Sequence, residues 1–338
     1  MISTESISQM FSEFNNLNAL VIGDVMVDSY IWGNVNRISP EAPVPIVEVK
    51  KRENRLGGAA NVGLNLKALG ATPILCSVIG TDQRGEDFTG LLDKEGLPTE
   101  GIIKCNDRIT TTKFRVIGNN AQLLRVDEET TSLLTEKQNQ QLWQKIESLI
   151  EENNIHVVVF QDYDKGVISK KLIEQVVNKS IEKNIPVVVD PKKANFLNYN
   201  HVTLFKPNLK EIKEGLNLEF NDNNDVDIEL AVSTLQDKLN AQIVLNTLSE
   251  KGVFISWRIE GGYESMLIPA HLRNIADVSG AGDTVISVAA LCLAQKIAPP
   301  VMAAIANLAG GIVCEEVGVV SVNKEKLRSE VNRLLART

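Results

Sequence analysis

The sequence has few of the residues that build metal sites and disulfides. It contains only four cysteines and three histidines among 338 residues, with no CxxC pair and no cysteine–histidine spacing suited to zinc. The cysteines are also too scattered to give a disulfide framework. We therefore expect them to behave as small buried hydrophobic side chains in a reducing compartment. The sequence therefore argues against zinc-dependent and disulfide-stapled classes of protein.

Basic residues are fewer than acidic ones. Lysine and arginine number 35 against 43 acidic residues, which gives a formal net charge of −8. Nucleic acids and acidic membranes require a broad basic surface, whereas an anionic small molecule needs only a local cluster of cations. Neither a bilayer-spanning apolar run nor a secretory signal is present. We expect a cytoplasmic protein without nucleic-acid or membrane partners.

The sequence does contain short apolar runs that alternate with helical patterns, after an amphipathic N-terminal helix capped by Ser3 or Thr4. Strands are expected at residues 19–23, 73–78, 157–160, 186–189 and 243–245, and helices at residues 136–151, 169–182 and 225–239. This order predicts an α/β fold with a mostly parallel central sheet covered on both faces. Ligands of such sheets bind at the carboxyl ends of the strands.

Residues 30–50 and 109–126 break this alternation. Both segments have alternating apolar positions and no helical period, and the second has a turn at residues 118–120. These features indicate extended strands outside the main sheet, with the second segment forming a hairpin. They would form either a small β-sheet lid that keeps water from a site, or ordinary hairpins at the sheet edge.

The run DVSGAGD at residues 277–283 is the strongest local signal. Asp277 and Asp283 enclose small residues, and the apolar segment 285–294 follows at once. This order predicts a glycine-rich loop at the start of a buried helix, where free N–H groups and the helix dipole favour a phosphate. Asp283 would then take a proton from an attacking hydroxyl group. The alternative is a tight turn with an aspartate in the first helical turn.

A second glycine-rich loop is expected at residues 56–62 (LGGAANV), entering a helix through Leu69. Its open backbone would admit a polyol, and Asn61 has both a donor and an acceptor for sugar hydroxyls. A helix start with close strand packing would explain the glycines equally well. Asp24 and Asp28 follow the first strand, where carboxylates either bind hydroxyl groups or cap the next turn.

Two more segments follow predicted strands. Asn208 and Glu211 have the spacing of a helix-capping box, and the alternative places Glu211 near a hydrated Mg²⁺, which needs few protein carboxylates. Residues 246–252 (NTLSEKG) have small polar side chains that would either contact a nucleotide or form an ordinary β-turn.

Together these motifs resemble the ribokinase (PfkB-type) family of sugar kinases over nearly the whole chain. GGAAN at residues 57–61, NxxE at 208–211 and DVSGAGD at 277–283 occur in the family's order. The resemblance implies a ribokinase-like three-layer fold, one kinase domain over residues 1–338, and ATP with Mg²⁺ as cofactors. Val278 and Asn246 depart from the family's pattern. Val278 belongs to the loop around which many members bind a monovalent cation, a site expected here near Asp277.

The resemblance also implies roles for individual residues. The expected catalytic base is Asp283, and the expected anion hole consists of the backbone amides of Gly280, Ala281 and Gly282. The expected sugar-binding residues are Asp28, Gly57, Gly58 and Asn61. The expected nucleotide-binding residues are Asn208, Thr247, Ser249, Gly252 and Asn307, with Glu211 near Mg²⁺ through water.

A narrower resemblance is to the heptose 7-phosphate kinases that make precursors of lipopolysaccharide core heptose. It depends on the segments GDVMVD, RISPEAPVP, QLLRVD, DYDKG and DPK, which begin at residues 23, 37, 122, 162 and 190. Such a substrate needs cations for its phosphate, and the alternative for any single cation is a solvated surface charge. The candidates near the expected site are Lys113, Arg115, Arg125, Lys165 and Lys192.

The resulting hypothesis is ATP-dependent phosphorylation of the anomeric (C1) hydroxyl of D-glycero-β-D-manno-heptose 7-phosphate, giving the 1,7-bisphosphate. The alternatives are a kinase of another sugar, sugar phosphate or nucleoside, such as ribose, fructose or adenosine, and a non-catalytic sugar- or nucleotide-sensing protein on the same fold. Because the sequence has no HxGH motif, we expect a kinase-only form without the nucleotidyltransferase domain of bifunctional members. Lid strands in this family often pair between subunits, so a homodimer through the lid is expected.

Overall fold

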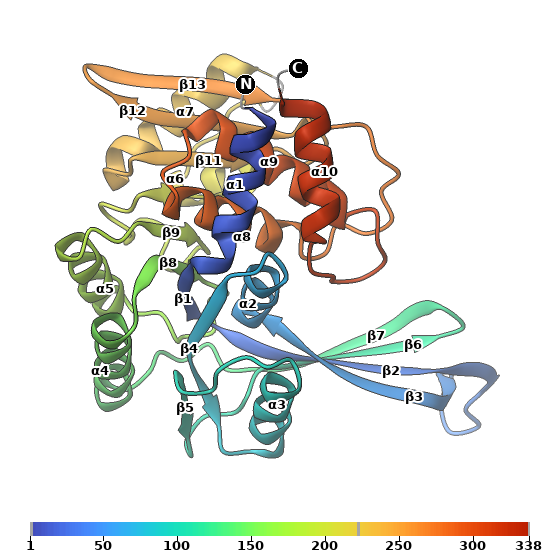
Figure 1. The fold of residues 1–338 in the computed structure, drawn as a ribbon. Coiled ribbons are helices and arrows are strands. Elements are labelled where there is room, and N and C mark those ends of the chain that lie inside the picture. Colours follow the sequence, from blue (N-terminus) through green and yellow to red (C-terminus); the bar gives the residue numbers. More distant parts are fainter. Residues whose placement is uncertain (1–2, 222–223, 337–338) are drawn as a thin grey trace.

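The computed structural model describes residues 3–221 and 224–336. Within these residues, a nine-stranded sheet has the order β13-β12-β11-β10-β9-β8-β1-β4-β5 (Figure 1). The pairs from β5 to β11 are parallel, and β12 and β13 extend the sheet in antiparallel fashion. The strands are β1 (Asn18–Gly23), β4 (Thr72–Gly80), β5 (Ile102–Cys105), β8 (Ile155–Gln161), β9 (Val187–Asp190), β10 (Leu204–Phe205), β11 (Ile243–Thr247), β12 (Val253–Ile259) and β13 (Gly262–Ile268).

Helices cover both faces of this sheet, because its strands are apolar on both sides. In β1, Ala19 and Val21 belong to one buried core, whereas Leu20 and Ile22 belong to the other. The first core packs against α1 (Thr4–Glu13), α2 (Ala59–Ala68), α3 (Gln83–Lys94), α8 (Ala281–Ala294), α9 (Pro299–Val313) and α10 (Lys324–Leu335). The second packs against α4 (Glu136–Glu152), α5 (Lys170–Glu182), α6 (Leu209–Leu216) and α7 (Asp225–Leu239). The predicted three-layer α/β fold is confirmed.

The local signals for helices are also confirmed. Ser3 caps α1 by accepting the N–H of Ser6, and Thr135 forms a capping box with Gln138 at the start of α4. Short 3₁₀ turns follow α1 at Phe14–Asn16 and β11 at Ser249–Lys251. No helix in residues 3–221 and 224–336 is both long and apolar enough to span a bilayer.

A smaller four-stranded sheet projects from the body of the molecule (Figure 1). Its order is β3-β2-β6-β7, with β2 at Val25–Ile38, β3 at Pro45–Gly58, β6 at Thr112–Gly118 and β7 at Ala121–Glu128. The two irregular sequence segments thus form extended strands outside the main sheet, and both of them form hairpins. Asn119 and Asn120, with φ of 51° and 65°, make the two-residue turn between β6 and β7.

Two irregularities interrupt the β2–β3 hairpin. The register shifts between Trp32 and Gly33, and again between Val35 and Arg37. The inner part of the hairpin, from Val25 to Trp32, pairs without interruption and lies next to the carboxyl end of β1. The smaller sheet therefore has a regular base beside the edge where ligands of an α/β sheet bind.

Candidate active site

The predicted helix start at Gly280 is present. Gly280 is the N-cap of α8 with φ of 80°, a left-handed conformation that suits glycine, and no side chain caps the helix. The first N–H groups of a helix have no acceptor within it, and the dipole is positive there. The backbone amides of Ala281 and Gly282 lie in this first turn. Their position fits a site for a phosphoryl group.

Asp283 also lies in the first turn of α8, and its side chain is held by three donors. The Asn61 amide donates to Oδ2 over 2.6 Å, and Oδ1 accepts bonds from Gln161 at 3.1 Å and the Tyr163 hydroxyl at 2.9 Å. Only 8% of Asp283 is exposed. The carboxylate is therefore fixed in orientation and largely shielded from solvent.

The surroundings of Asp283 adjust its proton affinity. Burial raises the pKa of Asp283 to about 6, with a further rise from Asp190, while the bonds from Asn61 and Tyr163 and the charge of Lys206 lower it. At neutral pH the group is mostly ionised but can still accept a proton. This is the condition for a general base at physiological pH.

The residues expected to form a glycine-rich loop before α2 do not form one. β3 continues through Gly57 and Gly58, and α2 begins directly at Ala59, so the expectation of a loop was wrong. Gly58 has φ of 61°, and a Cβ there would lie 2.3 Å from the Asp24 carbonyl oxygen. A Cβ on Gly57 would lie 2.4 Å from Oδ2 of Asp28. The glycines are required by close packing, and they also place Asn61 in the first turn of α2.

The two aspartates after β1 have different roles. Asp24 is 1% exposed, and its carboxylate accepts N–H bonds from Tyr163, Lys165 and Val167 at 2.9, 3.1 and 3.0 Å. Burial, assisted by nearby acidic charge, raises the pKa of Asp24 to about 6. Asp24 therefore anchors the loop after β8. Asp28 instead lies in β2, where its carboxylate contacts Gly57 and forms a 2.6 Å ion pair with Arg115.

Most of the cationic candidates already have an acidic partner. Arg125 pairs with Asp127 at 2.7 Å and Lys165 with Glu129 at 2.8 Å. Lys192 pairs with Glu211, a residue of α6. Lys113 forms no such ion pair with residues 3–221 or 224–336. Its ammonium instead lies over the Tyr163 ring, 5.9 Å from the ring centre.

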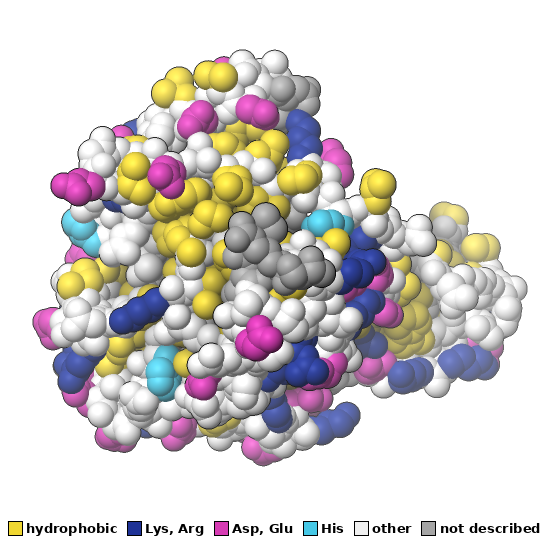
Figure 2. Space-filling model, turned by 45° about the horizontal axis from the view of Figure 1, so that its top comes forward, with side chains coloured by type: hydrophobic (Ala, Val, Ile, Leu, Met, Phe, Trp, Pro, Cys, Tyr) yellow, Lys and Arg dark blue, Asp and Glu magenta, His cyan; other side chains and the backbone are white. Residues whose placement is uncertain are grey.

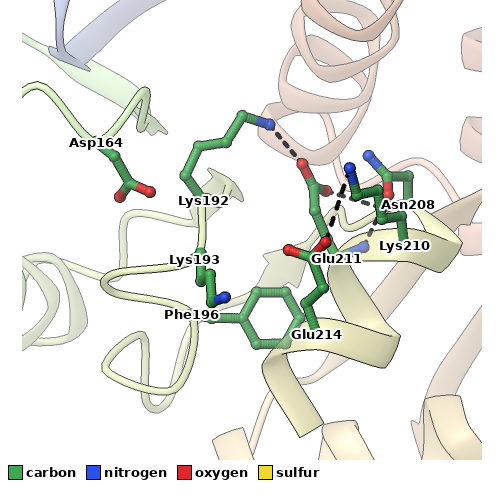
Figure 3. A pocket seen from close by; sticks show the side chains of 8 residues that line it. All are labelled: Asp164, Lys192, Lys193, Phe196, Asn208, Lys210, Glu211 and Glu214. Carbon is green, nitrogen blue, oxygen red and sulfur yellow. Dashed lines mark hydrogen bonds and ion pairs between the residues drawn. The ribbon is translucent and has the colours of Figure 1, made fainter. Parts of the chain in front are cut away.

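A cavity of about 310 Å³ lies beside α6 (Figure 3). Asn208 accepts the N–H of Glu211, and Glu211 accepts the N–H of Asn208, so the capping-box interpretation is confirmed. In Figure 3 the Lys192 side chain points across the cavity toward Glu211. The part of the chain that the structure describes contains no cluster of three side chains able to hold a metal. A hydrated Mg²⁺ needs few protein carboxylates, so a single carboxylate such as that of Glu211 fits such an ion.

Comparison with known proteins identifies the chain. A model described as "pfkB family carbohydrate kinase" matches residues 16–326. The chain belongs to the pfkB family of carbohydrate kinases.

Relatives of this kinase cover most of its length. The chain is 38% identical over 331 residues to "Bifunctional protein HldE" of Desulfatibacillum aliphaticivorans, covering 98% of the chain and 66% of that protein. It is 37% identical over 316 residues to the protein of the same name from Magnetococcus marinus, covering 93% and 64%. The chain therefore spans a little under two thirds of the length of these relatives.

Solved structures of pfkB-type kinases have the same fold. Phosphofructokinase-2 from Escherichia coli in complex with potassium has a TM-score of 0.76 at 19% identity, covering 94% of this chain and 99% of that one. Ribokinase from Arabidopsis thaliana, complexed with ribose and ATP, has a TM-score of 0.70 at 15% identity, covering 92% and 98%. The predicted ribokinase-like fold is confirmed.

The candidate nucleotide residues of the kinase lie near the carboxyl end of β11. Thr247 ends that strand and forms an isolated bridge with Asn208. Ser249 has φ of 52°, and Gly252, with φ of 97°, is close-packed against the Ile268 carbonyl. Residues 248–252 thus form a tight turn. Asn307 of α9 donates to the Pro269 carbonyl at 3.0 Å and so supports the segment before Asp277.

The two residues that depart from the family pattern have different surroundings. Val278 is 69% exposed. Asn246 is fully buried, and neither polar atom of its side chain has a partner among the described residues. Asp277 accepts the N–H groups of Ser279 and Gly318 at 2.9 and 3.0 Å. These bonds, with further donors from Val278 and the Ser279 side chain, lower the pKa of Asp277 and tie its carboxylate to the loop before α8.

Sequence reasoning assigned no role to four residues around Asp283. Gln161 contacts Asp283 and, at 3.4 Å, Asp190, which forms a 3.0 Å ion pair with Lys206. Tyr163 completes the set. Gln161 and Asp190 end β8 and β9, and Lys206 follows β10. The signal was available, since each residue is polar and lies at a strand end, but the sequence order does not show which strands are neighbours.

Proposed function

We propose that this kinase transfers the γ-phosphoryl group of ATP to the anomeric hydroxyl of D-glycero-β-D-manno-heptose 7-phosphate. The single observation that carries the kinase chemistry is Asp283, a buried carboxylate of raised pKa at the uncapped N-terminus of α8. The identity of the sugar depends on the resemblance to heptose 7-phosphate kinases, which the HldE relatives support.

In the proposed reaction, Asp283 takes the proton of the C1 hydroxyl as the new oxygen–phosphorus bond forms. The bond between the γ-phosphorus and the bridging oxygen breaks, and ADP leaves with its electron pair. Backbone amides from Gly280 to Gly282 stabilise the charge on the transferred group. Asn61 and Asp28 bind sugar hydroxyls beside Gly57 and Gly58.

The nucleotide would lie along the cavity beside α6 and the end of β11. Mg²⁺, when bound, would neutralise the phosphate charge beside Glu211. Asn208, Thr247, Ser249, Gly252 and Asn307 would line the nucleotide side of the site. A monovalent cation at Asp277 would make the rate depend on K⁺, which a titration of K⁺ against Na⁺ measures.

The smaller sheet would act as the lid of this single kinase domain and as its dimer interface. Leu124 and Val126 of β7 are 55% and 46% exposed, and hydrophobic side chains are visible on the projecting sheet beside basic ones (Figure 2). A second copy of the chain would cover these side chains. Sedimentation velocity tests this. Leu124→Glu should dissociate the dimer, whereas Leu133→Glu, at a 64% exposed site outside the sheet, should not.

A coupled ADP-release assay tests the function directly. We expect the heptose 7-phosphate to give a higher kcat/KM than ribose, fructose or adenosine, and phosphorus NMR of the product should show a phosphate on C1. A preference for an unphosphorylated sugar or nucleoside would overturn the proposal for the substrate. Binding of sugar and nucleotide without any ADP release would favour a non-catalytic sensor.

A further inference from the structure

The register of the smaller sheet places charged residues in rows across its four strands. One row runs Arg55, Asp28, Lys113 and Asp127 along β3, β2, β6 and β7. Residues paired across neighbouring strands point to the same side of a sheet. We call the side that bears this row the charged face. It faces the body of the kinase, because Lys113 lies over Tyr163 and Arg55 lies near Gly318.

The next row outward also carries cations. It runs Glu53, Tyr30, Arg115 and Arg125 along the same four strands. Both of its cations are neutralised by carboxylates of the sheet, Arg115 by Asp28 and Arg125 by Asp127. In the inner row, Arg55 is likewise paired with Glu53, at 2.7 Å.

Lys113 stands apart from these pairs. No carboxylate of residues 3–221 or 224–336 lies within ion-pair distance of its ammonium, although Asp28 and Asp127 are its neighbours in the row. Burial lowers the pKa of Lys113, and Asp28 opposes this effect. A half-buried ammonium that has lost part of its hydration gains most from an anionic ligand.

One aromatic ring connects this ammonium to the catalytic base. Lys113 lies 5.9 Å from the centre of the Tyr163 ring, and the Tyr163 hydroxyl donates to Asp283 over 2.9 Å. The ammonium therefore lies over the ring of the same tyrosine whose hydroxyl contacts the proposed base. A sugar whose reacting hydroxyl is at Asp283 would extend along this ring with its far end toward Lys113.

We propose that Lys113 binds the phosphate of a phosphorylated sugar substrate and sets the preference of the kinase for phosphorylated over unphosphorylated sugars. Tyr163 acts as a positioning residue that fixes the separation of phosphate and base. The assignment rests on the proposed sugar kinase function but not on the heptose itself. Any phosphorylated sugar that reaches from Asp283 to Lys113 would meet the same requirement.

The test compares each phosphorylated sugar with its dephosphorylated form, using heptose 7-phosphate with heptose and fructose 6-phosphate with fructose. Lys113→Gln should lower kcat/KM for the phosphorylated sugar by about 10- to 100-fold, mainly through KM, the usual effect of losing a charge-assisted hydrogen bond. For the dephosphorylated sugar the change should be within about 3-fold. Lys113→Arg should restore most of the loss.

Lys50→Gln is the matched control. It removes the same charge from β3 of the same sheet, at an exposed site paired with Glu48, and should leave both values unchanged. Equal losses of kcat/KM on both members of a pair, or no loss on the phosphorylated one, would overturn the assignment of Lys113.

The same experiments distinguish the phosphate-binding role of Lys113 from the identity of the sugar substrate. If fructose 6-phosphate is the better substrate and its preference over fructose depends on Lys113, the heptose proposal is wrong and the assignment stands. If the heptose phosphate is preferred but Lys113→Gln leaves that preference intact, the assignment is wrong and the heptose proposal stands. If wild-type enzyme prefers the phosphorylated member of neither pair, both are wrong.

Discussion

Asn61 donates a 2.6 Å hydrogen bond to Asp283, a residue 222 positions away in the sequence. Each lies in the first turn of a helix that directly follows a glycine of positive φ, Gly58 before α2 and Gly280 before α8. The two helices pack against each other, and Thr284 of α8 also donates to Asn65 of α2 at 2.9 Å. The proposed sugar-binding residue Asn61 and the proposed base Asp283 are therefore held on two helices that are packed and hydrogen-bonded to each other.

Removing the base should abolish most of the turnover. Asp283→Asn keeps the shape of the side chain but cannot accept a proton, so we expect kcat to fall by roughly 10²–10⁴, the usual contribution of a positioned base. Binding of the sugar phosphate, measured by calorimetry, should change only a few-fold. Near-normal turnover would exclude Asp283 as the base.

The pH dependence of the rate should report the ionisation of Asp283. Because its pKa is raised to about 6, kcat/KM should be constant above that pH and fall tenfold per unit below it. Tyr163→Phe removes a hydrogen bond that lowers this pKa, so the acid limb should move to higher pH. Tyr263→Phe removes a hydroxyl at the far edge strand β13 and should leave the limb in place. An unchanged limb in Tyr163→Phe would contradict the assignment.

The backbone at Gly58 should not tolerate a side chain. Gly58→Ala adds a Cβ 2.3 Å from the Asp24 carbonyl oxygen at φ of 61°, so the free energy of unfolding should fall by about 2 kcal/mol or more. Gly90→Ala is the control, because a Cβ there meets no atom within 4 Å in α3. That variant should gain about 0.5–1 kcal/mol. Chemical denaturation measures both, and equal effects would contradict the packing argument.

Glu211 combines a structural and a proposed chemical role, which can be separated. Glutamine is an accepted partner in a capping box, so Glu211→Gln should change the free energy of unfolding by less than about 1 kcal/mol. It removes the negative charge, so the Mg²⁺ concentration for half-maximal rate should rise several-fold. Asn208→Ala should cost about 1 kcal/mol through loss of the cap. An unchanged Mg²⁺ dependence in Glu211→Gln would leave the residue only its structural role.

The sequence predicted those parts of the site whose signal is local. Asp283, Asn61 and the Asn208 cap each lie at a helix start marked by glycines or by capping-box spacing, and local sequence decides such features. The predicted helices 136–151, 169–182 and 225–239 likewise match α4, α5 and α7 to within one residue at each end, whereas the predicted strands 73–78 and 157–160 are shorter than β4 and β8. The exception was the loop at residues 56–62, because β pairing with Val25 and Met26 extends β3 through both glycines.

Gln161, Asp190 and Lys206 could not be assigned in this way. They come from β8, β9 and the segment after β10, and only the order β10-β9-β8-β1 brings their side chains together at one edge. Periodicity within a segment does not encode the order of strands in a sheet. The isolated position of Lys113 likewise depends on cross-strand register, which the sequence of β6 alone does not specify.

The register shifts in the β2–β3 hairpin have a consequence for how such a kinase diversifies. A bulge absorbs an extra residue in one strand without passing the shift to neighbouring pairs. Insertions beyond Trp32 therefore leave Asp28 and Arg55 opposite each other. The distal half of the hairpin can therefore change in length while the regularly paired half beside β1 keeps its register.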